Sequence, residues 1–442
     1  MTTDNGEDNS RYTPLQTGHS ESGFYVLFAL QFLLVAASMF MDVKTGAFTL
    51  ILVLIMTFVI LVRCSSQGFD MSRAKNGMMC LFAVTGVFYF LEIANPNNVQ
   101  EAWNIGITHY WLYPFALSLI VPIAIRDRKG IEWLLFIWSV FILIATLKGY
   151  WQKNHGFSVR DRYFLFVLGG YRTHIIWPGI RYFSFFSDAA NYGVHCAMAL
   201  TTFLISAFYV RRGWMKIYFI LIALGAAYGL GISGTRAAMA VPLSGMLVYA
   251  VLSKSWKSII ISFVAVGAIF SFFYFTTIGS SNQYIRKMRT AFRPTEDASY
   301  LVRVENRKRM KTLMDDRPFG YGIGLAKGDR FPSKERMPYP PDSWLVSVWV
   351  ETGIVGLVLY LAVHGVLFAW CAWILLFKIM SKRLRGLLGA WLCMNAGFFV
   401  AAYANDVMQY PNSIVVYTGF ALCLAAPYLD KEMRKEEEDE EK

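Results

Sequence analysis

Repeated runs of mostly apolar residues, each long enough to cross a bilayer, constrain this chain more than any other feature. A helix needs about 20 such residues to span the hydrocarbon layer. About twelve candidate spans meet this condition, at 24–41, 46–62, 77–94, 110–125, 131–148, 189–210, 215–233, 236–252, 256–278, 352–377, 386–404 and 412–428. Of the 442 residues, 56% are hydrophobic and only 16% are charged, whereas soluble domains have about 25% charged residues. The sequence predicts an all-α polytopic membrane protein with about twelve transmembrane helices and excludes an ordinary soluble enzyme.

Lys and Arg side chains predict the orientation, because short cytoplasmic loops carry an excess of them. Alternate short loops are rich in these cations, at 63–75, 126–129, 211–216, 254–257 and 378–385. The opposite short loops contain only Lys44 and Arg236. We therefore expect both termini in the cytoplasm.

The same reading predicts the boundaries of the parts of the chain. Residues 1–23 are expected to form a flexible cytoplasmic tail, and residues 24–278 to contain transmembrane helices one to nine. Residues 279–342 form a large periplasmic loop between helices nine and ten in this interpretation. Helices ten to twelve follow within 343–428, and 429–442 is an acidic cytoplasmic tail.

Two loops on the predicted outer face, 149–188 and 279–342, carry many cations. A solvated surface loop explains any single one of these residues. For two clustered loops, an anionic ligand becomes a competitive explanation. Arginine suits phosphate in particular, because its planar guanidinium donates two parallel hydrogen bonds and keeps its charge.

Two segments place arginine beside the predicted start of a helix. In GIRYFSFFSDAANYG, Arg181 precedes an aromatic stretch, and the polar residues Asp188 and Asn191 open the next helix. A helix N-cap explains Asp188 but not Arg181. In SGTRAA, Arg236 lies in a tight turn between two apolar helices, where it either snorkels to the membrane interface or binds a lipid diphosphate.

The large loop contains a predicted short helix at 300–307, where Arg303 and Arg307 share one face. Further on, Gly322 and Gly324 belong to the segment PFGYGIG. Glycines in this spacing let the backbone approach a ligand closely, and an irregular turn explains them equally well.

Asp342 and Ser343 follow two prolines at the end of this loop. Asp342 either caps the following helix or presents a carboxylate next to the basic loop. The two interpretations stay open at this point.

Taken in order, GIRYFSFFSDAANYG, SGTRAA, PFGYGIG and SWLVSVWVETGIVGL resemble the signature segments of the O-antigen ligase and O-antigen polymerase superfamily. The resemblance covers residues 180–360 in detail. It implies a GT-C-like membrane fold and a glycosyltransferase of the bacterial inner membrane. Such enzymes act in lipopolysaccharide and other polysaccharide biosynthesis, with undecaprenyl-diphosphate-linked glycan as donor and a hydroxyl as acceptor. The resemblance implies no metal, no cofactor and no nucleic-acid partner.

The resemblance also implies roles for individual residues. Arg181, Arg236 and Arg303 would bind the diphosphate, and Arg236 and Asp342 would be catalytic. Asp342 occupies the position, nine residues before Glu351, at which the ligases have their histidine base. Candidate substrate-lining residues are Asp188, Asn191, Arg307, Gly322, Gly324 and Ser343.

The resemblance implies that aspartate at this position favours polymerase activity, in which the acceptor is a second lipid-linked glycan. The alternative is a ligase whose acceptor is lipid A core or a protein hydroxyl. A different class, a secondary transporter of an anionic or lipid-linked solute, would use polar residues within the spans, namely Glu92, Asn191, His195 and Glu351. Cations gathered in outward loops argue against this class.

Overall fold

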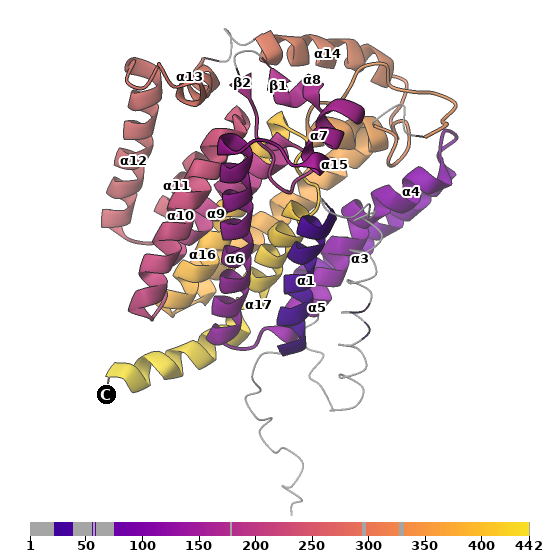
Figure 1. The fold of residues 1–442 in the computed structure, drawn as a ribbon. Helices are drawn as coiled ribbons and strands as arrows, with labels where there is room; N and C mark the ends of the chain where they lie inside the picture. Colours follow the sequence, from indigo (N-terminus) through magenta and orange to yellow (C-terminus); the bar gives the residue numbers. More distant parts are fainter. Residues whose placement is uncertain are drawn as a thin grey trace, which may run out of the picture.

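The protein is a bundle of helices that run between two ends, as seen in the computed structural model (Figure 1). The structure describes residues 22–38, 55, 58, 75–176, 179–293, 298–326 and 331–441. One end carries α8, α13, α14 and a short hairpin, and we call it the α14 end. The other end is called the opposite end.

Helices dominate the first half of the chain. They are α1 (Ser22–Ser38), α3 (Gly77–Leu91), η2 (Glu92–Ala94), α4 (Gln100–Ile107), η3 (Thr108–Leu112), α5 (Tyr113–Ala124), α6 (Arg128–Asn154), α7 (Val159–Arg162), η4 (Tyr163–Val167), α8 (Tyr171–His174), α9 (Ala189–Ser206) and α10 (Gly213–Ser233). Strands β1 (Ile175–Ile176) and β2 (Gly179–Ile180) pair antiparallel, with Ile175 opposite Ile180.

The second half continues in the same way. Its helices are η5 (Arg236–Met239), α11 (Ala240–Leu252), α12 (Trp256–Phe275), α13 (Gln283–Arg289), η6 (Thr290–Phe292), α14 (Ala298–Met314), α15 (Trp344–Trp373), η8 (Ile374–Lys378), α16 (Lys382–Ala404) and α17 (Asn412–Glu441). Helix α9 contacts α10, α11 and α16, and α17 contacts α5 and α16. These packed faces form the centre of the bundle.

The helical, polytopic character predicted from the sequence is confirmed. Within the described ranges, 8 helices are long and apolar enough to cross a membrane. They are Gly77–Ala94, Gln100–Ala124, Arg128–Asn154, Gly213–Ser233, Trp256–Phe275, Trp344–Lys378, Lys382–Ala404 and Asn412–Lys431. The total of twelve spans stays a prediction, and the candidate at 46–62 lies outside the described residues except for 55 and 58.

Helix α12 shows why the bundle suits a lipid environment. Its side chains are almost entirely on the outside, and Ile261, Phe263 and Val264 are each at least 60% exposed. Exposing so many large apolar groups to water would be unfavourable, whereas hydrocarbon is as apolar as they are. Since lipid satisfies no backbone groups, an all-helical surface is expected there.

Several helices extend beyond the apolar runs that predicted them. Helix α6 continues to Asn154, past the predicted end at 148. Helix α17 continues to Glu441, through the residues predicted as an acidic tail. Hydropathy detects only the apolar part of a helix, because backbone hydrogen bonding continues through polar residues without a change in geometry.

Candidate functional site

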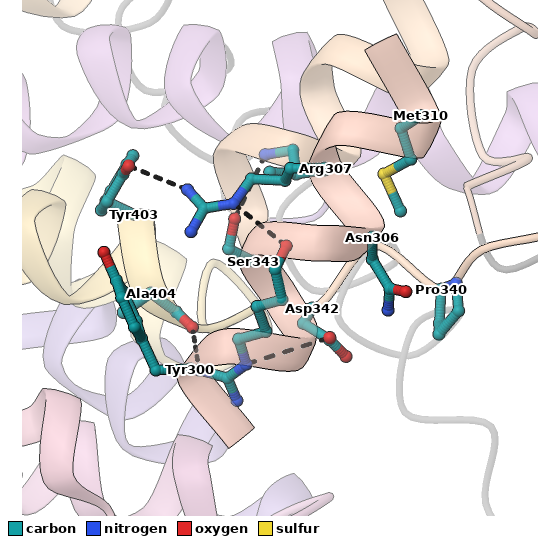
Figure 2. A pocket seen from close by; sticks show the side chains of 11 residues that line it. Tyr300, Asn306, Arg307, Met310, Pro340, Asp342, Ser343, Tyr403 and Ala404 are labelled. Atoms are coloured by element: carbon teal, nitrogen blue, oxygen red, sulfur yellow. Dashed lines mark hydrogen bonds and ion pairs between the residues drawn. The ribbon is translucent and has the colours of Figure 1, made fainter. Parts of the chain in front are cut away.

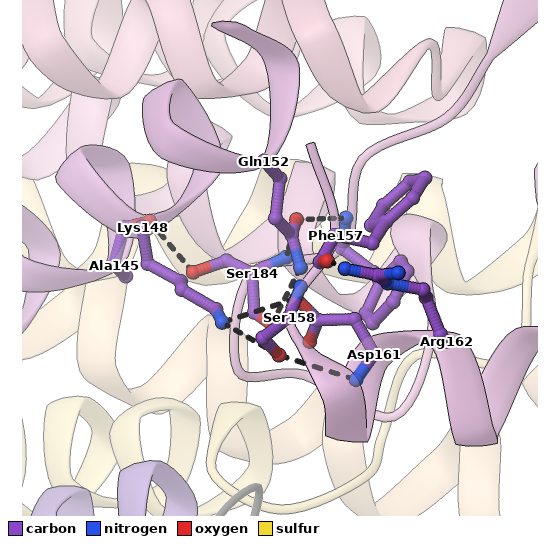
Figure 3. Close-up of polar contacts among 9 residues, drawn as sticks. Ala145, Lys148, Gln152, Phe157, Ser158, Asp161, Arg162 and Ser184 are labelled. Atoms are coloured by element: carbon purple, nitrogen blue, oxygen red, sulfur yellow. Dashed lines mark hydrogen bonds and ion pairs between the residues drawn. The ribbon is translucent and has the colours of Figure 1, made fainter. Parts of the chain in front are cut away.

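A network of buried hydrogen bonds attaches the segment that carries Arg181 to helix α6 (Figure 3). The Ser184 hydroxyl donates to the carbonyl of Ala145 at 2.6 Å, and the Ser184 N–H donates to Oε1 of Gln152 at 2.9 Å. Nearby, Lys148 Nζ lies 3.1 Å from a carboxylate oxygen of Asp161, whose side chain is fully buried. Breaking a buried hydrogen bond or ion pair costs free energy, because the remaining partner is left without water or a bonding group. These contacts therefore hold the segment in one position.

Arg181 follows β2 and turns its guanidinium onto the SGTR segment. Its Nε donates to the carbonyl of Ser233 at 3.2 Å, and Nη2 donates to the hydroxyl of Thr235 at 3.0 Å. Thr235 in turn donates to the carbonyl of Ala189 at 2.9 Å. The two motifs predicted from the sequence are therefore in direct contact, although 52 residues separate Arg181 from Ser233.

The turn between α10 and η5 directs Arg236 toward the end of α13. Arg236 Nη1 donates to the hydroxyl of Thr290 at 2.8 Å. Gly234 has a φ of 59°, a left-handed conformation that glycine adopts readily and other residues adopt at a cost. A Cβ there would lie 3.4 Å from Lys287 Nζ and 3.5 Å from Arg181 Cγ. Lys287 thus lies beside Arg181, a position that no motif in the sequence had indicated.

Arg236 and Arg303 both lie close enough to Arg181 for their charges to act on it. Burial lowers the pKa of the Arg181 guanidinium, Asp188 raises it, and the positive charges of Arg236 and Arg303 lower it further. Like charges repel, and an anion bound among them would relieve that repulsion. The structure therefore brings together all three arginines predicted to bind a diphosphate.

Arg303 joins this cation cluster to Asp342 in a narrow cleft of about 40 Å³ at the α14 end (Figure 2). Arg303 Nε lies 3.9 Å from Asp342 Oδ2, and Arg303 Nη1 donates to the carbonyl of Ala404 at 2.8 Å. One helical turn later, Arg307 Nη1 donates to the hydroxyl of Tyr403 at 2.8 Å. The prediction that Arg303 and Arg307 share one face is confirmed.

Asp342 does not cap helix α15. Ser343 is the N-cap, because its hydroxyl accepts from the N–H of Val346 at 3.3 Å. This corrects the capping alternative and leaves the Asp342 carboxylate to face Arg303. Burial raises the pKa of Asp342 above its usual value, and the charge of Arg303 opposes that rise. A raised pKa makes a carboxylate a better proton acceptor.

Asp188 is the N-cap of α9, as one interpretation of the sequence expected. One carboxylate oxygen accepts from the N–H groups of Ala190 at 2.7 Å and Asn191 at 2.9 Å. The other accepts from the side-chain amide of Asn191 at 2.7 Å. Asn191 is buried and also accepts a hydrogen bond from Asn412 of α17. Asp188 and Asn191 therefore organise the start of α9, and neither lines the cleft.

Gly322 and Gly324 approach the protein's own helices and not the cleft. Both have positive φ, 106° and 80°. A Cβ on Gly324 would collide with the carbonyl oxygen of Ala102 in α4. The Gly322 N–H donates to the carbonyl of Glu351 at 2.9 Å. The sequence predicted a close approach of this backbone to a ligand, whereas the structure shows a close approach to the protein's own helices.

Glu351 anchors this glycine segment, a role that the sequence alone did not reveal. Its carboxylate accepts from the hydroxyl of Tyr110 at 2.8 Å and from the N–H of Ala326 at 3.2 Å. Two residues later, α15 kinks at Gly353, which has a φ of 66°. The carboxylate thereby ties the loop before Asp342 to α15.

Replacing Glu351 with glutamine is expected to destabilise the protein by about 1–3 kcal/mol, because an amide group replaces one acceptor that buried donors need. Thermal unfolding of the purified protein in detergent measures this effect. The exposed Glu305, paired with Arg309 at 3.0 Å on the surface of α14, provides the control, and Glu305→Gln should change stability little. Equal effects of the two substitutions would contradict the anchoring role.

Arg289 and Arg293 form hydrogen bonds with backbone carbonyls at the C-terminal end of α12. Arg289 donates to the carbonyls of Phe272 and Phe273 at 3.1 and 3.2 Å, and Arg293 donates to that of Tyr274 at 3.3 Å. These carbonyls have no partners within their own helix. Both arginines therefore stabilise a helix end.

An apolar groove of about 430 Å³ ends beside the turn that carries Arg236. Helices α9 to α13 all contribute to it, and Gly231 and Met239 line it on either side of that turn. Its other lining residues are mainly aliphatic and aromatic, including Leu204, Met246 and Met288. The groove is suited to a flexible hydrocarbon chain.

In the described part of the chain, no three His, Cys, Asp or Glu side chains are grouped as a metal site requires. Residues 219–361 match the family model described as O-antigen ligase. This match includes Arg236, Arg303 and Asp342 but begins after Arg181. No curated protein matches the chain.

Proposed function

Since the chain belongs to the O-antigen ligase and polymerase superfamily, we propose that it transfers a glycan from an undecaprenyl-diphosphate-linked donor to an acceptor hydroxyl. The reaction would take place at the periplasmic face of the bacterial inner membrane, at the α14 end. The proximity of Arg181, Arg236 and Arg303 carries this proposal, because a diphosphate bound among three half-buried guanidinium groups would offset their mutual repulsion and accept hydrogen bonds from them.

The apolar groove supports a lipid-linked donor. A polyprenyl chain lying between α9 and α13 would bring its diphosphate to the turn that contains Arg236. Lys287, beside Gly234 and Arg181, would add a further positive charge there. A nucleotide-linked sugar has no hydrocarbon chain that could fill such a groove, so the groove favours a lipid-linked donor.

The proposed reaction is a single displacement. The acceptor oxygen attacks the anomeric carbon, the bond from that carbon to the diphosphate oxygen breaks, and the hydroxyl proton passes to Asp342. The diphosphate leaves with the bonding electron pair, and the guanidinium groups stabilise its growing charge. Interactions that strengthen as charge develops lower the barrier more than interactions formed equally with the ground state.

Polymerase activity is the favoured form of this reaction, with ligation to lipid A core or protein as the alternative. Asp342 at the position of the ligase histidine supports the polymerase. His174 of α8, at the α14 end of the bundle, is buried and accepts from the N–H of Ala189 at 3.1 Å. It therefore has a structural role at the start of α9.

Incubation of the purified protein with lipid-linked donor tests the proposal. A ladder of glycan lengths without any added acceptor would support the polymerase. Single addition to lipid A core or to a protein hydroxyl would identify a ligase. Movement of the donor across vesicles without any new glycosidic bond would instead identify a transporter and overturn the proposed activity.

A further inference from the structure

A second cavity lies at the opposite end of the bundle, between the end of α11 and the starts of α12 and α16. Its volume is about 370 Å³, and the side chains that line it are mainly polar. Neither the glycan chemistry nor any motif in the sequence accounts for it. We call it the α16 cavity.

Three cations line the α16 cavity, namely Lys254, Lys382 and Arg385. Lys254 has a φ of 52°, a strained conformation for a residue with a side chain, and its ammonium donates to the carbonyl of Leu376. Arg385 Nη1 donates to the carbonyl of Ile379 at 3.4 Å. The protein thus holds two of the three cations at the cavity wall through backbone carbonyls, which neutralise no charge.

Hydroxyl groups complete the lining. The hydroxyls of Tyr209 and Tyr249 lie 2.8 Å apart, and Ser253, Ser255 and Ser258 also contribute. None of the described residues that line the cavity is acidic. Cations and hydroxyl donors around a space without a carboxylate match the oxygen atoms of a phosphate group.

Two glycines of α16, Gly386 and Gly389, also line the cavity. A Cβ on Gly386 would collide with the ring of Tyr209. A Cβ on Gly389 would meet no other atom within 4 Å, although this residue is buried and lines the cavity. Position 389 therefore faces empty space, which a larger side chain would fill.

From these observations we infer that the α16 cavity binds a phosphate group, supplied by the headgroup of an anionic phospholipid. The cation-rich loops 254–257 and 378–385 place this end in the cytoplasm by the distribution of Lys and Arg. The cytoplasmic leaflet is the one with a negative surface potential. A lipid bound there would join α11, α12 and α16, whose other ends support Arg236 and the cleft.

Binding to the purified full-length protein in detergent tests this inference. Phosphatidylglycerol, phosphatidylethanolamine and inorganic phosphate are added separately, and native mass spectrometry and thermal unfolding report binding. Phosphatidylglycerol should bind in a saturable manner and raise the Tm. In Lys382→Gln/Arg385→Gln we expect its affinity to fall about 25-fold, since each cation near an anionic headgroup contributes about fivefold.

Two further variants separate this site from general surface charge. Lys216→Gln/Lys257→Gln removes two exposed cations at the same end that do not line the cavity, and it should bind phosphatidylglycerol as the wild type does. Gly389→Leu keeps every cation but fills the space, and it should lose binding. If the double cavity variant fails to fold, Lys382→Gln alone, at an exposed side chain, should still show the fivefold effect.

The outcomes are distinct. A Tm shift with inorganic phosphate that the cavity variants abolish would support a phosphate site filled from solution, and a response to phosphatidylglycerol alone would identify the lipid as the source. Equal binding of phosphatidylethanolamine would overturn the inference. The inference would also be overturned if Lys382→Gln/Arg385→Gln and Lys216→Gln/Lys257→Gln lost phosphatidylglycerol affinity equally, or if Gly389→Leu bound phosphatidylglycerol as the wild type does.

Discussion

Alanine in place of Arg236 is expected to reduce glycan transfer by about 100-fold or more, the effect of removing one group that stabilises developing negative charge. Arg236 Nη1 donates to the hydroxyl of Thr290 at 2.8 Å, and Arg236 lies where the apolar groove ends. Product formation by the purified variant, with lipid-linked donor at saturation, measures the loss. Arg236→Lys should recover only part of the activity, because an ammonium keeps the charge but not the planar fork.

Arg309→Ala is the matched control for this prediction. Arg309 is on α14, its side chain is 55% exposed, and it pairs with Glu305 on the surface. Its removal should leave transfer unchanged. If Arg236→Ala transfers glycan at the wild-type rate, the diphosphate does not depend on this guanidinium and the proposed site is wrong.

Asparagine in place of Asp342 is expected to lower the rate of transfer by about 10²–10⁴-fold, the usual contribution of a general base. The substitution keeps the size of the side chain and the cap at Ser343. It removes the only feature of Asp342 that the mechanism requires, a carboxylate that accepts a proton. Initial rates with lipid-linked donor and acceptor, at neutral pH, measure the loss.

The pH dependence gives a second test of the same residue. The carboxylate must be deprotonated to act, so the rate should fall as the pH falls through the pKa of Asp342. Burial raises that pKa and Arg303 lowers it. Arg303→Gln should therefore move the acid limb of the rate profile to higher pH, whatever its effect on the maximum rate.

Asp342→Glu is the control, because it retains the carboxylate and should retain an acid limb. Asp342→Asn should lose that limb together with its activity. An unchanged acid limb in Asp342→Asn would show that another group accepts the proton.

Local patterns in the sequence were sufficient to predict the class of fold and to single out most of the cationic residues of the candidate site. Apolar runs predicted the helices because the hydrophobic content of a segment does not depend on its neighbours in space. Arg181 and Arg303 stood out because they lie in two predicted outer loops that are unusually rich in cations, and Arg236 because the short loops of that face contain only one other cation, Lys44. The family segments in chain order carried the same information.

Only the tertiary structure decided which of these residues meet. Arg181 reaches Ser233 across 52 residues, and Glu351 reaches Tyr110 across 241. The choice between Asp342 and Ser343 as the cap depended on backbone geometry, and both side chains suit that role by composition. The α16 cavity likewise forms between helices distant in sequence. Pairwise geometry of this kind comes from packing the whole bundle, so no local pattern encodes it.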